Sequence, residues 1–113
     1  MKKHERMSNA YDLLDYESAL RCYHCGGENL HHERVEVFFR EEDADVGLVV
    51  QVSPDGVVVL PKGNQEGNPS IRRDGIAICM WCEFCRERSI YNVVQHKGYT
   101  LTSITEVPKN ESN

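Results

Sequence analysis

From Arg34 onward, apolar and polar residues alternate with the two-residue period that is typical of β-strands. Residues 34–39, RVEVFF, would place Val35, Val37 and Phe39 on one face of a strand and the residues between them on the other. The acidic segment REEDAD then separates this strand from the next apolar stretch. No stretch after residue 21 has the period of a helix, so the pattern predicts β-structure.

A hairpin is expected over residues 46–60, where the apolar segments VGLVVQV and VVVL are joined by SPDG. Pro54 presets φ for a tight turn, and Gly56 can adopt the positive φ that closes it. These features are typical of two antiparallel strands that follow one another in the chain.

Three further strands are expected over residues 76–81, 89–95 and 99–105. Residues 61–75 are rich in Gly, Pro and Asn and lack a hydrophobic period, which predicts a long loop. Loops of this length in compact domains are more often functional or mobile than merely connecting. The sequence HKG predicts a turn between the last two strands, with Gly98 at a positive φ. The chain is therefore expected to form a small, mostly β, antiparallel domain.

The division of the chain follows from this pattern. Residues 1–21 are expected to form an N-terminal arm or a short helix, residues 22–105 the β domain, and residues 106–113 a flexible tail. An amphipathic helix and an extended arm both fit the first segment. The apolar residues that would form one face of the helix are Tyr11, Leu14, Ala19 and Leu20.

Length and composition are those of a single small soluble domain of 113 residues with a net charge of −5. No apolar run approaches the ~20 residues that cross a bilayer, and no hydrophobic stretch follows the N-terminal lysines as in a signal peptide. We therefore expect a cytoplasmic protein that does not bind membranes. The acidic balance weakens the case for non-specific nucleic-acid binding, which depends on a positive field.

The cysteines fall into two groups with the same spacing. Cys22 and Cys25 form a CxxC motif followed by two glycines, and Cys79, Cys82 and Cys85 are each three positions apart. In a reducing compartment paired CxxC motifs indicate a metal rather than disulfides. A glycine after the second cysteine permits the tight turn in which backbone N–H groups bond to thiolates. The sequence therefore predicts a structural zinc site.

Strand alternation selects the four ligands from the five thiols. Pairing Cys82 with Cys85 leaves a six-residue strand before the turn, whereas pairing Cys79 with Cys82 would shorten that strand to three residues. The expected zinc ligands are Cys22, Cys25, Cys82 and Cys85. Cys79 is then expected to be a small buried strand residue. A spare or exchanging ligand is the alternative role for Cys79.

The motifs CYHCGG, NPSIRRDGIAICMWCEFC and QHKG resemble those of a family of small bacterial and phage zinc-ribbon proteins, most of which have no assigned role. The resemblance covers roughly residues 22–104. The family pattern has no cysteine at the position of Cys79, and it has an aromatic residue where this chain has Met80. The resemblance implies a zinc-ribbon fold and, by itself, no activity.

Catalytic chemistries fit the sequence poorly, so we expect no enzyme. A zinc deaminase needs its His on a helix, a Pro before the paired cysteines and an open coordination position for water. Here His31 and Glu33 lie at the start of a strand pattern, and four thiolates would fill the metal site. An iron–sulfur site of the ferredoxin type would have a fourth nearby Cys followed by Pro. A thiol oxidoreductase would place its CxxC motif at a helix N-terminus.

A binding function is therefore expected, through basic residues in the C-terminal half. The predicted partner-binding residues are Arg72, Arg73, His96 and Lys97. A cationic patch on an acidic protein suits an acidic protein surface or a phosphate backbone. Few aromatic residues are placed for stacking on bases, so a protein partner is the first interpretation and nucleic acid the alternative. Ion pairs between the two arginines and the acids of residues 41–45 would be a purely structural role for these cations.

Overall fold

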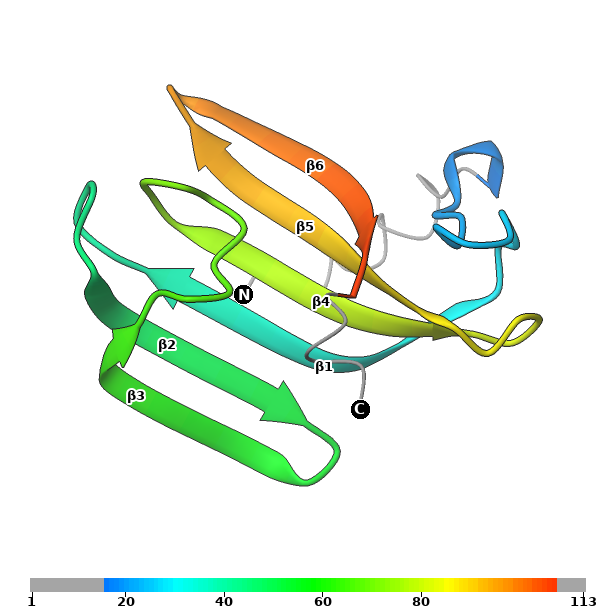
Figure 1. Cartoon of the computed structure of the whole chain (residues 1–113), viewed down its shortest axis with the longest axis horizontal. Coiled ribbons are helices and arrows are strands. Elements are labelled where there is room, and N and C mark those ends of the chain that lie inside the picture. The colour runs from blue at the N-terminus through cyan, green and yellow to red at the C-terminus, as the bar shows by residue number, and fades with distance from the viewer. Residues whose placement is uncertain (1–15, 108–113) are drawn as a thin grey trace, which may run out of the picture.

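The computed structural model describes residues 16–107, and all six strands in that range belong to one antiparallel sheet (Figure 1). The order of strands across the sheet is β3-β2-β1-β4-β5-β6. The strands are β1 (Leu30–Phe39), β2 (Val46–Ser53), β3 (Gly56–Asn64), β4 (Gly75–Cys82), β5 (Arg88–His96) and β6 (Tyr99–Glu106). A single turn of 3-10 helix, η1 (Tyr16–Ser18), precedes them. The mostly β, antiparallel architecture predicted from the sequence is confirmed.

The two predicted tight turns are present. β2 and β3 form the expected hairpin, with Ser53 paired to Gly56 across the turn. β5 and β6 are joined by Lys97 and Gly98, and Gly98 has a φ of 84°. The register of β1 against its neighbours also confirms the predicted alternation of its side chains.

The predicted loop over residues 61–75 is shorter than expected, because β3 continues to Asn64. Pro61 lies inside this strand although it cannot donate a ladder hydrogen bond. The strand tolerates Pro61 because β3 is at the edge of the sheet, where one side of the backbone needs no partner strand. The loop that crosses to β4 therefore begins at Gln65.

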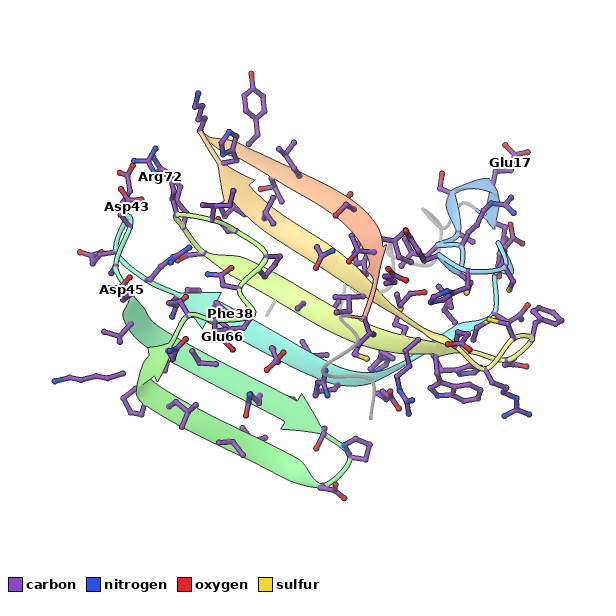
Figure 2. All side chains as sticks on the ribbon, in the orientation of Figure 1. Glu17, Phe38, Asp43, Asp45, Glu66 and Arg72 are labelled. Atoms are coloured by element: carbon purple, nitrogen blue, oxygen red, sulfur yellow. The ribbon has the colours of Figure 1, made fainter. Side chains whose placement is uncertain are left out.

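The buried core of the sheet lies on the face that carries Phe38, called the Phe38 face. Phe38 pairs with Val49 across β1 and β2, and both side chains are almost fully buried. Ala77 of β4 completes this cluster, with Ile90 packed against it. The chain between β3 and β4 crosses the same face (Figures 1 and 2), and a Cβ placed on Gly67 would lie 3.7 Å from the Phe38 ring. The core is therefore a sheet face covered by a loop.

Arg40, directly after β1, fastens that loop to the sheet. Its guanidinium donates hydrogen bonds to the backbone carbonyls of Ser70 at 2.7 Å, Ala44 at 3.0 Å and Arg73 at 3.2 Å. Ser70 in turn donates its hydroxyl to the carbonyl of Gln95 in β5 at 3.2 Å. A half-buried cation thus satisfies backbone carbonyls that a loop folded onto a sheet would leave without partners.

The other side of the sheet, called the Val37 face, is rich in aliphatic residues. In each strand register the partners of Val37 are also apolar, Val50 of β2 and Ile76 of β4. Since residues 16–107 form a single sheet, no second sheet within that range covers this face. By register and alternation, its apolar residues are Val35, Val37 and Phe39 of β1, Leu48, Val50 and Val52 of β2, Val57 and Val59 of β3, Ile76 and Ile78 of β4, and Tyr91 and Val93 of β5.

The N-terminal prediction can be followed only in part. Tyr11 and Leu14 lie outside the described residues, as do residues 108–113 of the predicted tail. Ala19 and Leu20 directly follow the short η1 turn, and Leu20 is exposed. Between residues 16 and 107 no helix has the length and apolar character needed to cross a membrane.

Candidate metal centre

The structure brings the four predicted cysteines together at one end of the sheet. The Sγ atoms of Cys22, Cys25, Cys82 and Cys85 all lie within 4.8 Å of one another. The pairs Cys22–Cys85 and Cys25–Cys82 are each 3.6 Å apart, so all are free thiols and none is a disulfide. Four thiolates around one ion at ~2.3 Å would be about 3.8 Å apart in a tetrahedron. The cluster therefore has the dimensions of a site for one metal ion.

The two CxxC turns have the same backbone hydrogen bonds. Cys22 N–H donates to the carbonyl of Gly27 at 2.8 Å, and Cys82 N–H donates to that of Glu87 at 3.1 Å. Within each turn a residue four positions after the first cysteine donates back to that cysteine's carbonyl at 3.0 Å; these residues are Gly26 and Arg86. The shared geometry explains why equal spacing in the sequence produces equal presentation of thiols.

Backbone N–H groups point at the sulfur atoms. His24 N–H lies 3.3 Å from Cys22 Sγ, and Gly27 N–H lies 3.4 Å from Cys25 Sγ. Burial raises the pKa of the Cys22 thiol, but hydrogen bonds from the backbone N–H groups of Cys25 and His24, together with those from the Cys85 and Ser89 side chains, lower it to about 6. These donors therefore favour the thiolate, which is the form that binds metal.

The Cys85 thiol shows the electrostatic effect of placing four thiols close together. The backbone N–H of Glu87 favours its thiolate, but burial and the three neighbouring cysteines together raise the pKa of Cys85 to about 12. Four thiolates this close repel one another, so they cannot all ionise together unless a positive ion neutralises them. The electrostatics and the geometry of the cluster therefore both suit a metal ion.

The first cysteine turn is attached to β5 by Ser89, a residue that the sequence did not single out. Ser89 is fully buried, and its hydroxyl accepts the N–H of Tyr23 at 3.1 Å. The same hydroxyl lies 3.9 Å from Cys22 Sγ. The His24 ring also lies 2.9 Å from the carbonyl of Arg88, so the first cysteine turn contacts β5 at a second point.

The two turns also contact each other directly. Glu83 N–H donates to the carbonyl of Asn29 at 3.1 Å, and the Glu83 carboxylate contacts the His31 ring. A Cβ at Gly27 would come within 2.8 Å of the Phe84 ring. Gly27 therefore allows close packing of one turn against the other, whereas Gly26 adopts a positive φ without the steric cost of a Cβ.

Cys79 lies outside the group of four. It is buried in β4 as predicted, with its Sγ 3.7 Å from the Glu33 carboxylate. Burial raises the pKa of the Cys79 thiol, which favours the neutral form. Glu33 forms an ion pair with Arg88. Neither Glu33 nor His31 belongs to the cysteine cluster.

The predicted partner-binding residues gather at the opposite end of the sheet, because β4 runs from the loop at Gly75 to the cysteine turn at Cys82. Arg72 donates bidentate hydrogen bonds to Asp43 at 2.8 and 3.0 Å and one to Glu42 at 2.6 Å (Figure 2 shows Arg72 beside Asp43). Arg73 also reaches Glu42, at 3.1 Å. The acidic pairing that the sequence left open as an alternative is therefore present.

These cations border an apolar hollow of about 250 Å³ between the loop and the β5–β6 end. Its walls include Val94 and Leu101, and His96 lies at its rim with Arg72 and Arg73. Lys97 is exposed in the adjacent turn. We call this region, residues 69–73 together with 94–101, the loop–turn surface. The sequence predicted the cations of this surface but not its apolar centre. Ile71, an apolar residue within a polar loop, was the feature of the sequence that could have indicated it.

Searches against protein-family models, curated proteins and solved structures find no match to this chain.

Proposed function

We propose that this chain is a small, cytoplasmic, zinc-binding protein of the zinc-ribbon type that acts without catalysis, as an interaction module for a protein partner. The proposal that the chain binds a metal rests on the cluster of four thiols, whose sulfur atoms lie within 4.8 Å of one another. A set of four thiolates leaves no open position for water or substrate, which is characteristic of structural rather than catalytic zinc. The resemblance of the cysteine motifs to zinc-ribbon proteins supports the same assignment.

Iron is the competing metal, because a tetrahedral set of four thiolates suits either ion. The thiols fit one ion, which argues against a cluster of several irons because such a cluster would hold them further apart, and the resemblance of the cysteine motifs to zinc-ribbon proteins favours zinc over a single iron. Zinc has a filled d shell and is colourless, while iron thiolates absorb visible light. Elemental analysis together with an absorption spectrum of the purified chain tests this choice. One equivalent of zinc and a spectrum without visible bands are expected, and stoichiometric iron would contradict the proposal.

The loop–turn surface supports the proposal that the chain binds a protein partner. Ile71 is 91% exposed at the tip of the loop, beside a hollow lined by aliphatic residues. Arg72, Arg73 and His96 border that hollow with polar groups and cations, and Lys97 is exposed in the adjacent turn. An apolar centre with a polar rim is the usual anatomy of a protein interface.

Nucleic acid is the second candidate, because four basic or titratable side chains lie together there. The structure favours it less, since Arg72 and Arg73 are already paired with Glu42 and Asp43. A phosphate backbone would have to compete with those carboxylates for the same guanidinium groups.

One experiment separates the two candidates. The zinc-loaded chain and an Ile71→Glu, Leu101→Glu variant are immobilised in parallel and exposed to extract of the source cells and to labelled DNA and RNA. We expect a protein that the wild type retains and the variant does not, with retention that survives moderate salt. Lys62→Glu, on an exposed residue of β3, is the control. Retention of DNA or RNA that weakens steeply with salt would support the nucleic-acid alternative instead.

A further inference from the structure

The β2–β3 hairpin exposes far more apolar surface than the rest of the sheet. On the Val37 face Val57 is 62% exposed, Val59 54% and Phe39 47%; on the Phe38 face Val49 is 2% exposed, while Val58 and Leu60 of the edge strand are 50% and 41% exposed. Leu48 and Val52 are exposed on the Val37 face as well. Single exposed aliphatic residues are common, but contiguous apolar patches of this kind mark interfaces.

This patch carries almost no charge. Residues 46–60 contain one charged residue, Asp55, which lies at the tip of the hairpin turn. The whole chain has a net charge of −5, so two copies repel one another over most of their surfaces. That repulsion is weakest where two Val37 faces meet.

The size of the Val37 face matches what a dimer requires. The five strands that contribute apolar residues, β1 to β5, lie about 4.8 Å apart and are about eight residues long, so they cover a footprint of about 24 by 26 Å. A standard protein interface buries ~800 Å² on each partner. The hairpin patch together with the aliphatic residues of β1, β4 and β5 can therefore supply a complete interface.

A second copy also supplies the layer that the sheet lacks. Stable domains bury an apolar sheet face against a second layer, and residues 16–107 provide only one sheet. Two identical twisted sheets pack face to face in the aligned arrangement of β-sandwiches, and a two-fold axis makes the contact self-complementary. Pro61 and Lys62 interrupt the outer edge of β3, which disfavours assembly by adding strand to strand.

We propose that the chain forms a homodimer in which the Val37 faces of two copies, including both β2–β3 hairpins, pack against each other. The interface is on the side of the sheet opposite the core loop. It is distinct from the loop–turn surface, so a dimer would present two partner sites and two metal centres.

Sedimentation equilibrium of the full-length, zinc-loaded chain over a concentration series tests the proposal. The wild type is expected to dimerise, and Val57→Glu with Val59→Glu is expected to weaken the dimer by roughly a hundredfold, because carboxylates would be buried without partners. Val57→Thr with Val59→Thr keeps the β-branched shape and is expected to weaken it less. The control is Val58→Glu, on the same strand and 50% exposed on the other face, and it is expected to leave the dimer intact. Circular dichroism and zinc content establish that each variant is folded.

Several results would overturn the proposal. A wild type that remains monomeric at all concentrations is one, and so is equal loss of dimer in the Val57→Glu, Val59→Glu variant and the Val58→Glu control. If the wild type is monomeric and deletion of residues 1–15 produces a dimer, the chain's own N-terminal segment occupies the face. A monomer that instead captures an unrelated protein through Val57 and Val59 would assign the face to a different partner.

Discussion

Gly26 and Arg86 occupy equivalent positions in the two cysteine turns, and both have a positive φ, of 77° and 67°. Each donates its backbone N–H to the carbonyl of the first cysteine of its turn at 3.0 Å. Glycine adopts this conformation freely, whereas an L-residue with a Cβ does so at a cost. The second turn therefore carries backbone strain that the first lacks. The Arg86 guanidinium lies 5.7 Å from the centre of the Trp81 ring, a cation–π contact that offsets part of it.

Substitutions at these two positions should show the strain. Arg86→Ala and Arg86→Gly both remove the cation–π contact, but only the glycine variant also removes the steric cost of the positive φ. We expect Arg86→Gly to be more stable than Arg86→Ala by about 1 kcal/mol, and Gly26→Ala to be less stable than the wild type by about 1 kcal/mol. Denaturant unfolding of the zinc-loaded proteins measures both differences. Equal stabilities of the two Arg86 variants would show that the turn is not strained.

The ligand set predicts opposite effects of two neighbouring cysteines. Cys82→Ser should lose most of the bound metal, because it removes one of four thiolates. Cys79→Ser is the matched control and should keep a full equivalent, since Cys79 lies outside the cluster. Elemental analysis of both purified variants checks this. Full metal content in Cys82→Ser with loss in Cys79→Ser would show that the ligand set is wrong.

Removal of the metal should unfold much of the domain. Cys25 and Cys82 are 57 positions apart, and within residues 16–107 the buried apolar cluster away from the metal is small, with Phe38, Val49 and Ala77 at its centre. In small domains with a thin core, the free energy of metal binding becomes free energy of folding. Circular dichroism and thermal unfolding before and after chelation measure the effect. An unchanged spectrum and thermal midpoint after verified metal removal would contradict this expectation.

Ser89 should support the metal site without being a ligand. Ser89→Ala removes the acceptor for the Tyr23 N–H and the hydroxyl beside Cys22 Sγ. Loss of such supporting contacts typically lowers metal affinity by about 10- to 100-fold. Ser103→Ala, which alters a hydrogen bond to Asn92 within the sheet, is the control and should leave the affinity unchanged. Competition with a chromophoric chelator gives both affinities, and equal values for the two variants would exclude this role for Ser89.

The paired arginines of the loop–turn surface should affect partner binding rather than folding. Arg72→Ala with Arg73→Ala is expected to leave zinc content and fold intact and to weaken binding of the captured partner by roughly tenfold or more, as for lost charge-assisted contacts. Lys62→Ala serves as the control. Calorimetric titration with the partner measures the change, and undiminished binding by the folded double variant would contradict the prediction.

The carboxylates that hold these arginines allow a converse test. Arg72 lowers the pKa of the Asp43 carboxyl through its hydrogen bonds, so the pair is ionised at neutral pH. Glu42→Gln with Asp43→Asn would release both guanidinium groups from their ion pairs. If the arginines contact the partner, this variant should bind it more tightly. No change would mean that the arginines serve only to solvate and fasten the loop.

The sequence by itself determined the features that depend on neighbouring residues. Alternation gave the strands, and the chemistry of Pro54, Gly56 and Gly98 gave the turns, because steric limits on φ act within a few residues. The same holds for the cysteines: the tight CxxC turn is local, and the alternation of the preceding strand selected Cys82 and Cys85 over Cys79, so the sequence predicted which thiols converge.

The tertiary structure decided what depends on residues far apart in the chain. Alternation shows that Val37 and Phe38 face opposite ways, but only the loop crossing the sheet makes the Phe38 face the core. Arg40 and Ser89 look ordinary in the sequence, because the carbonyls and thiol that they contact are brought near only by strand pairing. Hydrogen bonds and apolar contacts depend on proximity in space, and for these residues that proximity is created by the order β3-β2-β1-β4-β5-β6.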